Sequence, residues 1–233
     1  MIFLILPASS PESWGIRSFV LRQGRLTHAQ SRALDELLPH YGLDISQSPF
    51  DFQKIFGRNT KRTLEIGFGN GENLLALART HPDEDFLGIE VHRPGIGHLL
   101  MALEAGKITN VRVLRADAVD VLAKCIPDIS LDAVLLYFPD PWPKKRHHKR
   151  RLIQPKFAAL VARKLKTGGR FHLATDWPDY AAHMLAVLSA SPDFTAAEEA
   201  SYVPQSPDRP PTKFERRGLK LGNPVTDLIF VRR

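Results

Sequence analysis

Five acidic side chains stand at the ends of short apolar runs between residues 65 and 176: Glu65, Glu90, Asp117, Asp140 and Asp176. If these runs are parallel β-strands, their carboxyl ends meet at one edge of a sheet, where the ligands of open α/β sheets bind. A carboxylate at that edge can accept hydrogen bonds from ribose hydroxyls or an amino group. One such acid alone would be better explained as a helix N-cap, whereas five together favour a shared crevice.

A glycine-rich turn, Gly67, Gly69 and Gly71 in "LEIGFGNGENLL", follows the first of these runs. Glycines at the end of a strand let the backbone approach a ligand closely. A dinucleotide fingerprint would need its third glycine at position 72, which is Glu72. Glu65 on the preceding run would repel a pyrophosphate and attract an amino or sulfonium group. The turn therefore favours S-adenosylmethionine over NAD.

Glu90 and Asp117 extend this interpretation to the next two runs. Glu90 follows Gly71 by nineteen residues, where an acid at the end of the second strand can accept from both hydroxyls of a ribose. Asp117 closes the third run and could accept from an adenine amino group. Both residues are predicted to bind the cofactor.

The segment 137–151, "YFPDPWPKKRHHKRR", begins as a buried strand and ends as a polycation. A proline on each side of Asp140 can continue neither a strand ladder nor a helix, so the prolines stop the strand and stiffen the loop. This places the Asp140 carboxylate at the mouth of the crevice. Trp142 has two open interpretations, a platform on which a base stacks or an apolar plug beneath the loop.

Residues 144–151 carry six lysines and arginines and no acid, and they account for six of the seven positive charges in the formal net charge of +7. A local cationic patch of this kind makes nucleic acid the first partner to consider. His147 and His148 have no nearby cysteine, so we expect pH-sensitive RNA contacts and no metal site.

The elements that position these residues alternate between short apolar runs and longer amphipathic segments, which indicates a parallel sheet covered by helices. Strands are predicted at 62–67, 86–91, 111–117, 131–139 and 169–176, and two further antiparallel strands at 194–201 and 227–233. Helices are predicted at 26–42, 72–81, 95–106, 119–126, 151–165 and 177–190, the fifth ended by Gly168 and Gly169. Thr27 and Gln30 are spaced as a capping box at the start of the first helix.

The N-terminal 60 residues are predicted to form an arm and a helix ahead of a main domain at 61–233. Arg17, Arg22 and Arg25 in this arm are either a second basic contact surface or simply exposed. The apolar run at 2–6 is too short for a signal sequence or a membrane span, so we expect a cytoplasmic protein that does not contact membrane.

The single cysteine, Cys125, excludes an intramolecular disulfide and is expected to be a small buried hydrophobic residue. The chain is expected to be a monomer rather than a homodimer.

Several of these motifs together resemble one family. "EIGFGNGENL", "FLGIEVHRPGIG", "PDPWPKKRHHKRR", "FHLATDWPDYA" and "TKFERRGLKLG" closely resemble segments of the bacterial tRNA (guanine-N(7)-)-methyltransferases, which modify the variable-loop guanine at tRNA position 46. The resemblance runs from about Arg17 to the C-terminus. It implies an α/β, Rossmann-like class I methyltransferase fold with a mainly parallel seven-stranded sheet, helices on both faces and a short N-terminal helical extension.

The resemblance also implies roles for individual positions, with Asp140 as the catalytic residue. Cofactor-contacting positions would be Glu65, Gly67, Gly69, Glu90, Asp117, Ala118 and Asp140. Positions that contact the tRNA substrate would be Lys144, Arg146, His147, His148, Lys149, Arg150, Arg151, Asp176, Thr212, Lys213, Phe214 and Glu215.

Two rival functions remain open on the sequence. An enzyme that methylates an exocyclic amino group of RNA or DNA could also grip a base with a proline-rich loop after the fourth strand. A non-catalytic RNA-binding protein could keep the same fold, although the full set of strand-end acids argues against it.

Overall fold

The fold is a single mixed β-sheet with helices on both faces, seen in a computed structural model that describes residues 18–19, 24–197, 203–204 and 225–233. The strands run in the order β3-β2-β1-β4-β5-β8-β6, and the short β7 pairs with β8. Their bounds are β1 Arg62–Ile66, β2 Asp85–Ile89, β3 Val111–Leu114, β4 Leu131–Tyr137, β5 Leu165–Thr175, β6 Phe194–Ala196, β7 Val203–Pro204 and β8 Thr226–Arg232. The predicted seven-stranded sheet is confirmed, and β7 adds two residues beside it.

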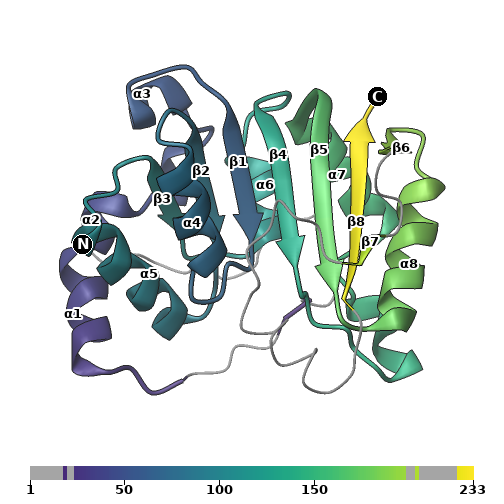
Figure 1. The fold of residues 1–233 in the computed structure, drawn as a ribbon, viewed down its shortest axis with the longest axis horizontal. Helices are drawn as coiled ribbons and strands as arrows, with labels where there is room; N and C mark the ends of the chain where they lie inside the picture. Colours follow the sequence, from purple (N-terminus) through teal and green to yellow (C-terminus); the bar gives the residue numbers. More distant parts are fainter. Residues whose placement is uncertain (1–17, 20–23, 198–202, 205–224) are drawn as a thin grey trace.

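Strands β1 to β5 are parallel, whereas β8 is antiparallel to β5 and β6 is antiparallel to β8. The arrowheads of β1, β2, β4 and β5 therefore point to the same edge of the sheet in Figure 1, while that of β8 points to the opposite edge. This geometry brings the ends of the predicted acid-bearing strands together.

The helices divide between the two faces of the sheet (Figure 1). One face is covered by α1, α4 and α5, and the other by α6, α7 and α8. Their bounds are α1 His28–Glu36, α2 Leu38–Tyr41, α3 Phe52–Phe56, α4 Glu72–Thr80, α5 Arg93–Ala105, α6 Ala118–Lys124, α7 Pro155–Lys164 and α8 Pro178–Ser189, with 3-10 turns at Ile45–Gln47 and Lys145–Arg150.

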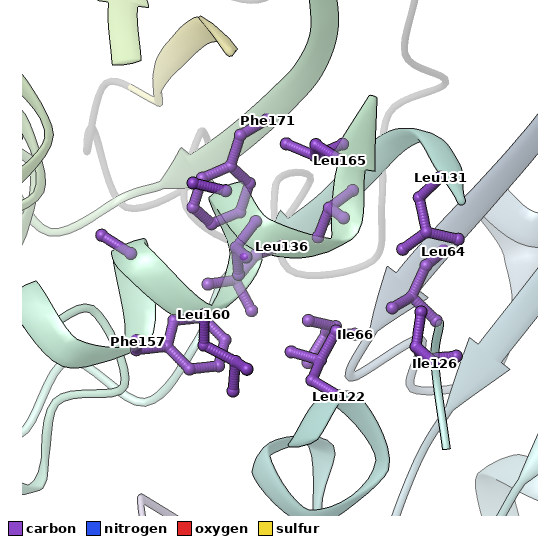
Figure 2. Close-up of a cluster of buried hydrophobic side chains, with 14 of the residues drawn as sticks. Leu64, Ile66, Leu122, Ile126, Leu131, Leu136, Phe157, Leu160, Leu165 and Phe171 are labelled. Carbon is purple, nitrogen blue, oxygen red and sulfur yellow. The ribbon is translucent and has the colours of Figure 1, made fainter. Parts of the chain in front are cut away.

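The larger core lies between the sheet and the helices α6, α7 and α8. Figure 2 shows Leu64, Ile66 and Leu136 of the sheet facing Leu122 and Phe157 of the helices. Strands of a parallel sheet are buried on both sides, which is why these runs are continuously apolar in the sequence. Burial of each such side chain contributes roughly 1.5–3 kcal/mol to folding, so the sheet is a rigid support for the loops at its edge.

The predicted helix at 151–165 is wrong at both ends. The helix α7 begins only at Pro155, where a proline is well suited to a first helical turn because its missing N–H would have no partner there. It ends at Lys164, and β5 begins at once, with Leu165 beside Leu131 of β4. Gly168 and Gly169 therefore lie inside the strand, where the β4–β5 register shifts, instead of ending the helix.

The N-terminal helix has the predicted capping box, since the Gln30 amide donates to Thr27 Oγ1 at 3.2 Å and the Thr27 amide donates to Gln30 Oε1 at 2.9 Å. The predicted single helix at 26–42 is nevertheless split after Glu36, because Pro39 lacks the N–H that would continue the ladder. Helix α1 packs on α5, where a Cβ at Gly97 would lie 3.0 Å from Gln30. The division at residues 60 and 61 stays a prediction.

Two strands are at least three residues shorter than predicted. The third ends at Leu114 instead of Asp117. In the predicted 194–201 strand, β6 covers only Phe194–Ala196, and residues 198–202 lie outside the described residues.

Cys125 is buried as predicted, and burial raises the pKa of its thiol to about 11. Within the described ranges, no helix has the length and apolarity of a membrane span.

Candidate active site

A cleft of about 1000 Å³ opens at the carboxyl ends of β1, β2, β3 and β4. All seven residues predicted to contact a cofactor line it: Glu65, Gly67, Gly69, Glu90, Asp117, Ala118 and Asp140. Two of the predicted substrate residues, Lys144 and His147, line the same cleft. The sheet thus brings together residues that are up to 82 positions apart in the chain.

The glycine turn at the floor of the cleft requires glycine for two different reasons. Gly67, Gly69 and Gly71 all have positive φ, at 72°, 58° and 79°, a region that other residues avoid. A Cβ at Gly67 or Gly69 would meet nothing within 4 Å, whereas one at Gly71 would lie 2.7 Å from Leu99. The first two glycines therefore provide backbone conformation, and the third also permits close packing against α5.

Glu90 holds this turn in place. Its carboxylate accepts from the Gly69 amide at 2.8 Å, the Val91 amide at 2.7 Å and the His92 amide at 3.0 Å. On the other side of the turn, a Cβ at Gly95 of α5 would lie only 2.0 Å from the Gly69 carbonyl oxygen. The turn is thus fixed between an acceptor just after β2 and the backbone of α5.

Glu65 is buried in the cleft floor, with 3% of its surface exposed, and accepts a hydrogen bond from Asn73 Nδ2 at 2.9 Å. The neutral Asn73 amide satisfies one acceptor site of this carboxylate and adds no charge of its own. Asn73, itself 4% exposed, was not predicted from the sequence. The sequence shows Asn73 only as a second polar residue beside Glu72 in the first turn of α4.

Asp117 fits both interpretations of a strand-end acid. It is the N-cap of α6, since its Oδ1 accepts from the Val119 amide at 2.9 Å, and it lines the cleft. Each carboxylate oxygen has more than one acceptor direction, so the cap does not prevent a second hydrogen bond.

The loop that carries Asp140 is strained on both sides of this residue. β4 ends at Tyr137, and Phe138 and Trp142 have φ values of 51° and 47°. A non-glycine residue in this left-handed region costs about 1–3 kcal/mol, and such strain persists where the surrounding contacts impose it, often at functional sites. Asp140 itself is exposed at the rim of the cleft.

Trp142 is held from three sides. Its indole N–H donates to the Ser18 carbonyl at 2.9 Å, the Arg150 guanidinium carbon lies 4.8 Å from its ring centroid, and the His147 ring meets it edge-on at 5.8 Å. These contacts agree with the plug interpretation, because one ring face is covered by a cation. Ser18 and Phe19 also line the cleft, and nothing in the local sequence distinguished them beforehand.

The predicted basic segment forms a 3-10 turn along the rim, with Lys144, Arg146 and Lys149 exposed. Partial burial, followed by the neighbouring cations Arg146 and Arg150, lowers the pKa of His147, so this imidazole is neutral at neutral pH. His148 is half-buried, with Nε2 3.8 Å from the Asp179 carboxylate.

Arg151 differs from the other members of the segment. Its side chain is 1% exposed and forms an ion pair with Asp179, so the structure does not present it to an RNA phosphate. Sequence alone placed Arg151 with the exposed cations because the run is uniformly basic.

The remaining residues that were predicted to contact the substrate either lie away from the cleft or fall outside the described residues. Asp176 follows β5, is half-buried and does not line the cleft. Arg25 is exposed. Thr212, Lys213, Phe214, Glu215, Arg17 and Arg22 lie outside the described residues. In the part of the chain that the structure describes, no group of three or more His, Cys, Asp or Glu side chains could hold a metal ion.

Comparisons with known proteins agree with this architecture. The sequence model of a family described as "Putative methyltransferase" matches residues 59–228. A protein named tRNA (guanine-N(7)-)-methyltransferase from Pseudomonas syringae pv. syringae (strain B728a) is 56% identical over 92% of this chain and 88% of its own. One of the same name from Alkalilimnicola ehrlichii (strain ATCC BAA-1101 / DSM 17681 / MLHE-1) is 58% identical over 94% of this chain and 93% of its own.

Among solved structures, the crystal structure of a 30S ribosomal A1408 methyltransferase from an uncultured bacterium superimposes with a TM-score of 0.55. It is 12% identical, and the match covers 82% of this chain and 95% of that one. This likeness shows the Rossmann-like class I methyltransferase fold alone. With more than half of the sequence identical to curated relatives over nearly its whole length, the chain belongs to the tRNA (guanine-N(7)-)-methyltransferase family.

Proposed function

We propose that this protein transfers a methyl group from S-adenosylmethionine to ring nitrogen 7 of the variable-loop guanine, position 46, of tRNA. The observation that carries the proposal is one cleft lined by a glycine turn and four strand-end carboxylates, with an exposed basic segment on its rim. Relatives that carry this activity in their names are 56% and 58% identical to the chain.

The residues of the cleft fit S-adenosylmethionine. When bound, this cofactor supplies an electrophilic methyl group on a sulfonium centre. The buried Glu65 carboxylate suits the positively charged amino group of such a molecule, because a charge attracts its opposite more strongly where water is excluded. Glu90 and Asp117 are acceptors for ribose hydroxyls and for the adenine amino group, and the bare backbone at Gly67 and Gly69 allows a close approach.

The chemistry at guanine needs little proton transfer, since ring nitrogen 7 already has a lone pair in the base plane. The enzyme mainly has to hold this nitrogen in line with the methyl group, and positioning of this kind can lower a barrier by several kcal/mol. The Asp140 carboxylate, held at the rim by a strained loop, would accept from the N–H groups of the base and stabilise the positive charge that reaches the purine.

The exposed cations Lys144, Arg146 and Lys149 would bind phosphates around the target guanine. Phosphate contacts orient an RNA without reading its sequence. Selection of one guanine would then come from tRNA shape and from Asp176 and the segment Thr212 to Glu215. We also propose that the protein acts as a monomer, and that it acts in the cytoplasm, where its tRNA substrate is found.

Nucleoside analysis tests the reaction. Purified protein is incubated with S-adenosylmethionine and an unmodified tRNA transcript, and the digested RNA is examined by mass spectrometry. The proposal predicts 7-methylguanosine, which carries a fixed positive charge. A neutral guanosine methylated on its amino group would point to the exocyclic rival, and tRNA binding without any methylated nucleoside would point to a binding protein.

Replacement of Glu90 by glutamine should weaken cofactor binding about tenfold. Glutamine keeps one acceptor oxygen, but its amino group would face the Gly69 N–H, a donor opposite a donor, and the turn would lose its anchor. Isothermal titration with S-adenosylmethionine measures the change. Glu84→Gln is the control, since Glu84 precedes the same strand at the opposite edge of the sheet and pairs there with Lys61. Equal affinities for the two variants would contradict this role of Glu90.

Replacement of Lys149 by alanine should weaken tRNA binding and reduce the slope of log affinity against log salt by roughly 0.7–0.9, because one phosphate contact is lost. The control Lys61→Ala removes an equal charge from a 71% exposed side chain at the opposite edge of the sheet. Binding titrations at several salt concentrations give the slopes. Identical slopes for both variants and the parent protein would argue against an RNA contact at Lys149.

A further inference from the structure

Arg151, the last residue of the basic segment 144–151, is not accessible to RNA in the way that its exposed neighbours are. Its side chain is 1% exposed, although it ends a run in which Lys144, Lys145, Arg146 and Lys149 all face solvent. Burial of a charge is costly unless the charge is paired and hydrogen-bonded. The contacts that the buried guanidinium makes therefore indicate its structural role.

Three contacts hold the guanidinium. Nε donates to the Pro141 carbonyl at 2.9 Å, and a terminal nitrogen forms an ion pair with the Asp179 carboxylate. The guanidinium carbon lies 4.9 Å from the centroid of the Tyr180 ring, which is fully buried. The fork of an arginine can make all of these contacts at once, whereas the single point charge of a lysine cannot.

The two ends of this bridge lie in very different surroundings. Asp179 and Tyr180 belong to the first turn of α8, which packs into the larger core. Pro141 directly follows Asp140, in the loop whose residues Phe138 and Trp142 have left-handed backbone conformations. Arg151 thus ties a strained loop at the rim of the cleft to a rigid helix.

The support beneath Arg151 is itself fixed. The Tyr180 hydroxyl accepts from the Ile153 amide at 3.3 Å, and burial raises the pKa of Tyr180 to about 12, so the ring stays neutral beside the cation. The hydrogen bond from Arg151 is the main reason that the pKa of Asp179 is lowered, so this carboxylate is charged throughout the neutral range. Gln154 Nε2 donates to the Arg151 carbonyl at 3.3 Å and holds the adjoining backbone.

We propose that Arg151 is a positioning residue that sets the orientation of Asp140 by clamping the next carbonyl, Pro141, to Asp179 of α8. It acts through the loop and binds neither cofactor nor RNA. This inference rests on the proposed function, because it assumes that Asp140 orients the guanine. A misplacement of about 1 Å in such a group can reduce turnover about 100-fold.

The chain provides a matched control for the loss of a buried cation. Lys164 Nζ pairs with Asp128 Oδ1 at 2.6 Å, with side chains that are 4% and 55% exposed, compared with 1% and 63% for Arg151 and Asp179. Neither Lys164 nor Asp128 lines the cleft. Arg151→Met and Lys164→Met therefore both remove a buried charge from a half-exposed partner, and only the first touches the loop of Asp140.

Steady-state kinetics, thermal midpoints and hydrogen exchange of residues 138–150 are measured for both variants. For Arg151→Met we expect kcat to fall about 100-fold, with the KM for tRNA within about threefold of the parent, as for a residue that makes no phosphate contact. Exchange in 138–150 should become faster. Lys164→Met should show a similar fall in thermal midpoint with kcat and exchange of this segment unchanged. Arg151→Lys should recover only part of the lost turnover.

Three results would overturn the inference. The first is a raised KM for tRNA with unchanged kcat in Arg151→Met, which is the behaviour of a phosphate contact. The others are equal losses of kcat in Arg151→Met and Lys164→Met, and unchanged hydrogen exchange of residues 138–150 in Arg151→Met. Should Arg151→Met not fold, Asp179→Asn compared with Asp128→Asn is judged by the same measures. Exchange does not depend on activity, so it decides whether Arg151 clamps the loop even if the parent protein makes no 7-methylguanosine and the proposed function fails.

Discussion

Replacement of Asp140 by asparagine should lower kcat about 100- to 1000-fold. Asparagine is close in shape to aspartate and keeps one acceptor oxygen, so the loop and the packing of Trp142 against Ser18 and Arg150 should survive. What disappears is the negative charge at the rim of the cleft, which would stabilise the positive charge on the methylated purine. Steady-state kinetics with S-adenosylmethionine and tRNA transcript give kcat and KM separately.

The affinity for tRNA should change much less than turnover, because phosphate contacts come from the basic segment and not from Asp140. Asp120→Asn is the control, since it removes a carboxylate from the exposed face of α6, where Asp120 pairs with Lys124 at 2.8 Å. Equal losses of turnover and tRNA affinity in Asp140→Asn would refute the catalytic assignment and make Asp140 a binding residue.

Replacement of Gly95 by alanine should abolish high-affinity cofactor binding. Alanine normally stabilises a helix interior by about 0.5–1 kcal/mol relative to glycine. Here the new Cβ would lie 2.0 Å from the Gly69 carbonyl oxygen and 2.9 Å from its carbon, so either α5 or the glycine turn must move. We expect a loss of stability of about 1–3 kcal/mol. Calorimetric titration and thermal unfolding measure the two effects.

Gly97→Ala separates this clash from a general disturbance of α5. Gly97 lies two residues further along the same helix, and its Cβ would meet Gln30 of α1 at 3.0 Å, on the side away from the glycine turn. It should cost stability with cofactor affinity nearly unchanged. Normal cofactor binding by Gly95→Ala would show that the turn tolerates displacement and is not shaped by α5.

The strand-end acids could be predicted because a parallel sheet fixes where its carboxyl ends lie. Glu65, Glu90 and Asp117 stand at or just after the ends of three β-strands, and the sheet order alone brings them to one cleft. The glycine turn was equally accessible, since its three left-handed residues need glycine. Local rules that act through a few residues were thus enough to place the cofactor side of the cleft.

The contacts made by the loop after β4 were not accessible in the same way. Trp142 bonds to Ser18, 124 residues away, and Arg151 pairs with Asp179, 28 residues away. Neither contact is visible as a local sequence pattern, because a run of basic residues looks the same whether its last arginine faces water or packs on a tyrosine ring. The end of the helix predicted at 151–165 has a similar cause: α7 stops at Lys164 because Leu165 pairs with Leu131 of β4, a partner that the local helical pattern does not reveal.

The most direct test of the proposed reaction locates the methyl group on the tRNA. Guanine methylated on ring nitrogen 7 becomes sensitive to reduction and to strand scission by aniline, which reads the modification at single-nucleotide resolution. After incubation of a transcript with the protein and S-adenosylmethionine, we predict one cut, at the variable-loop guanine of position 46, and none when that guanine is replaced. Cuts at other guanines, or an intact transcript that nevertheless carries the methyl group, would contradict this prediction.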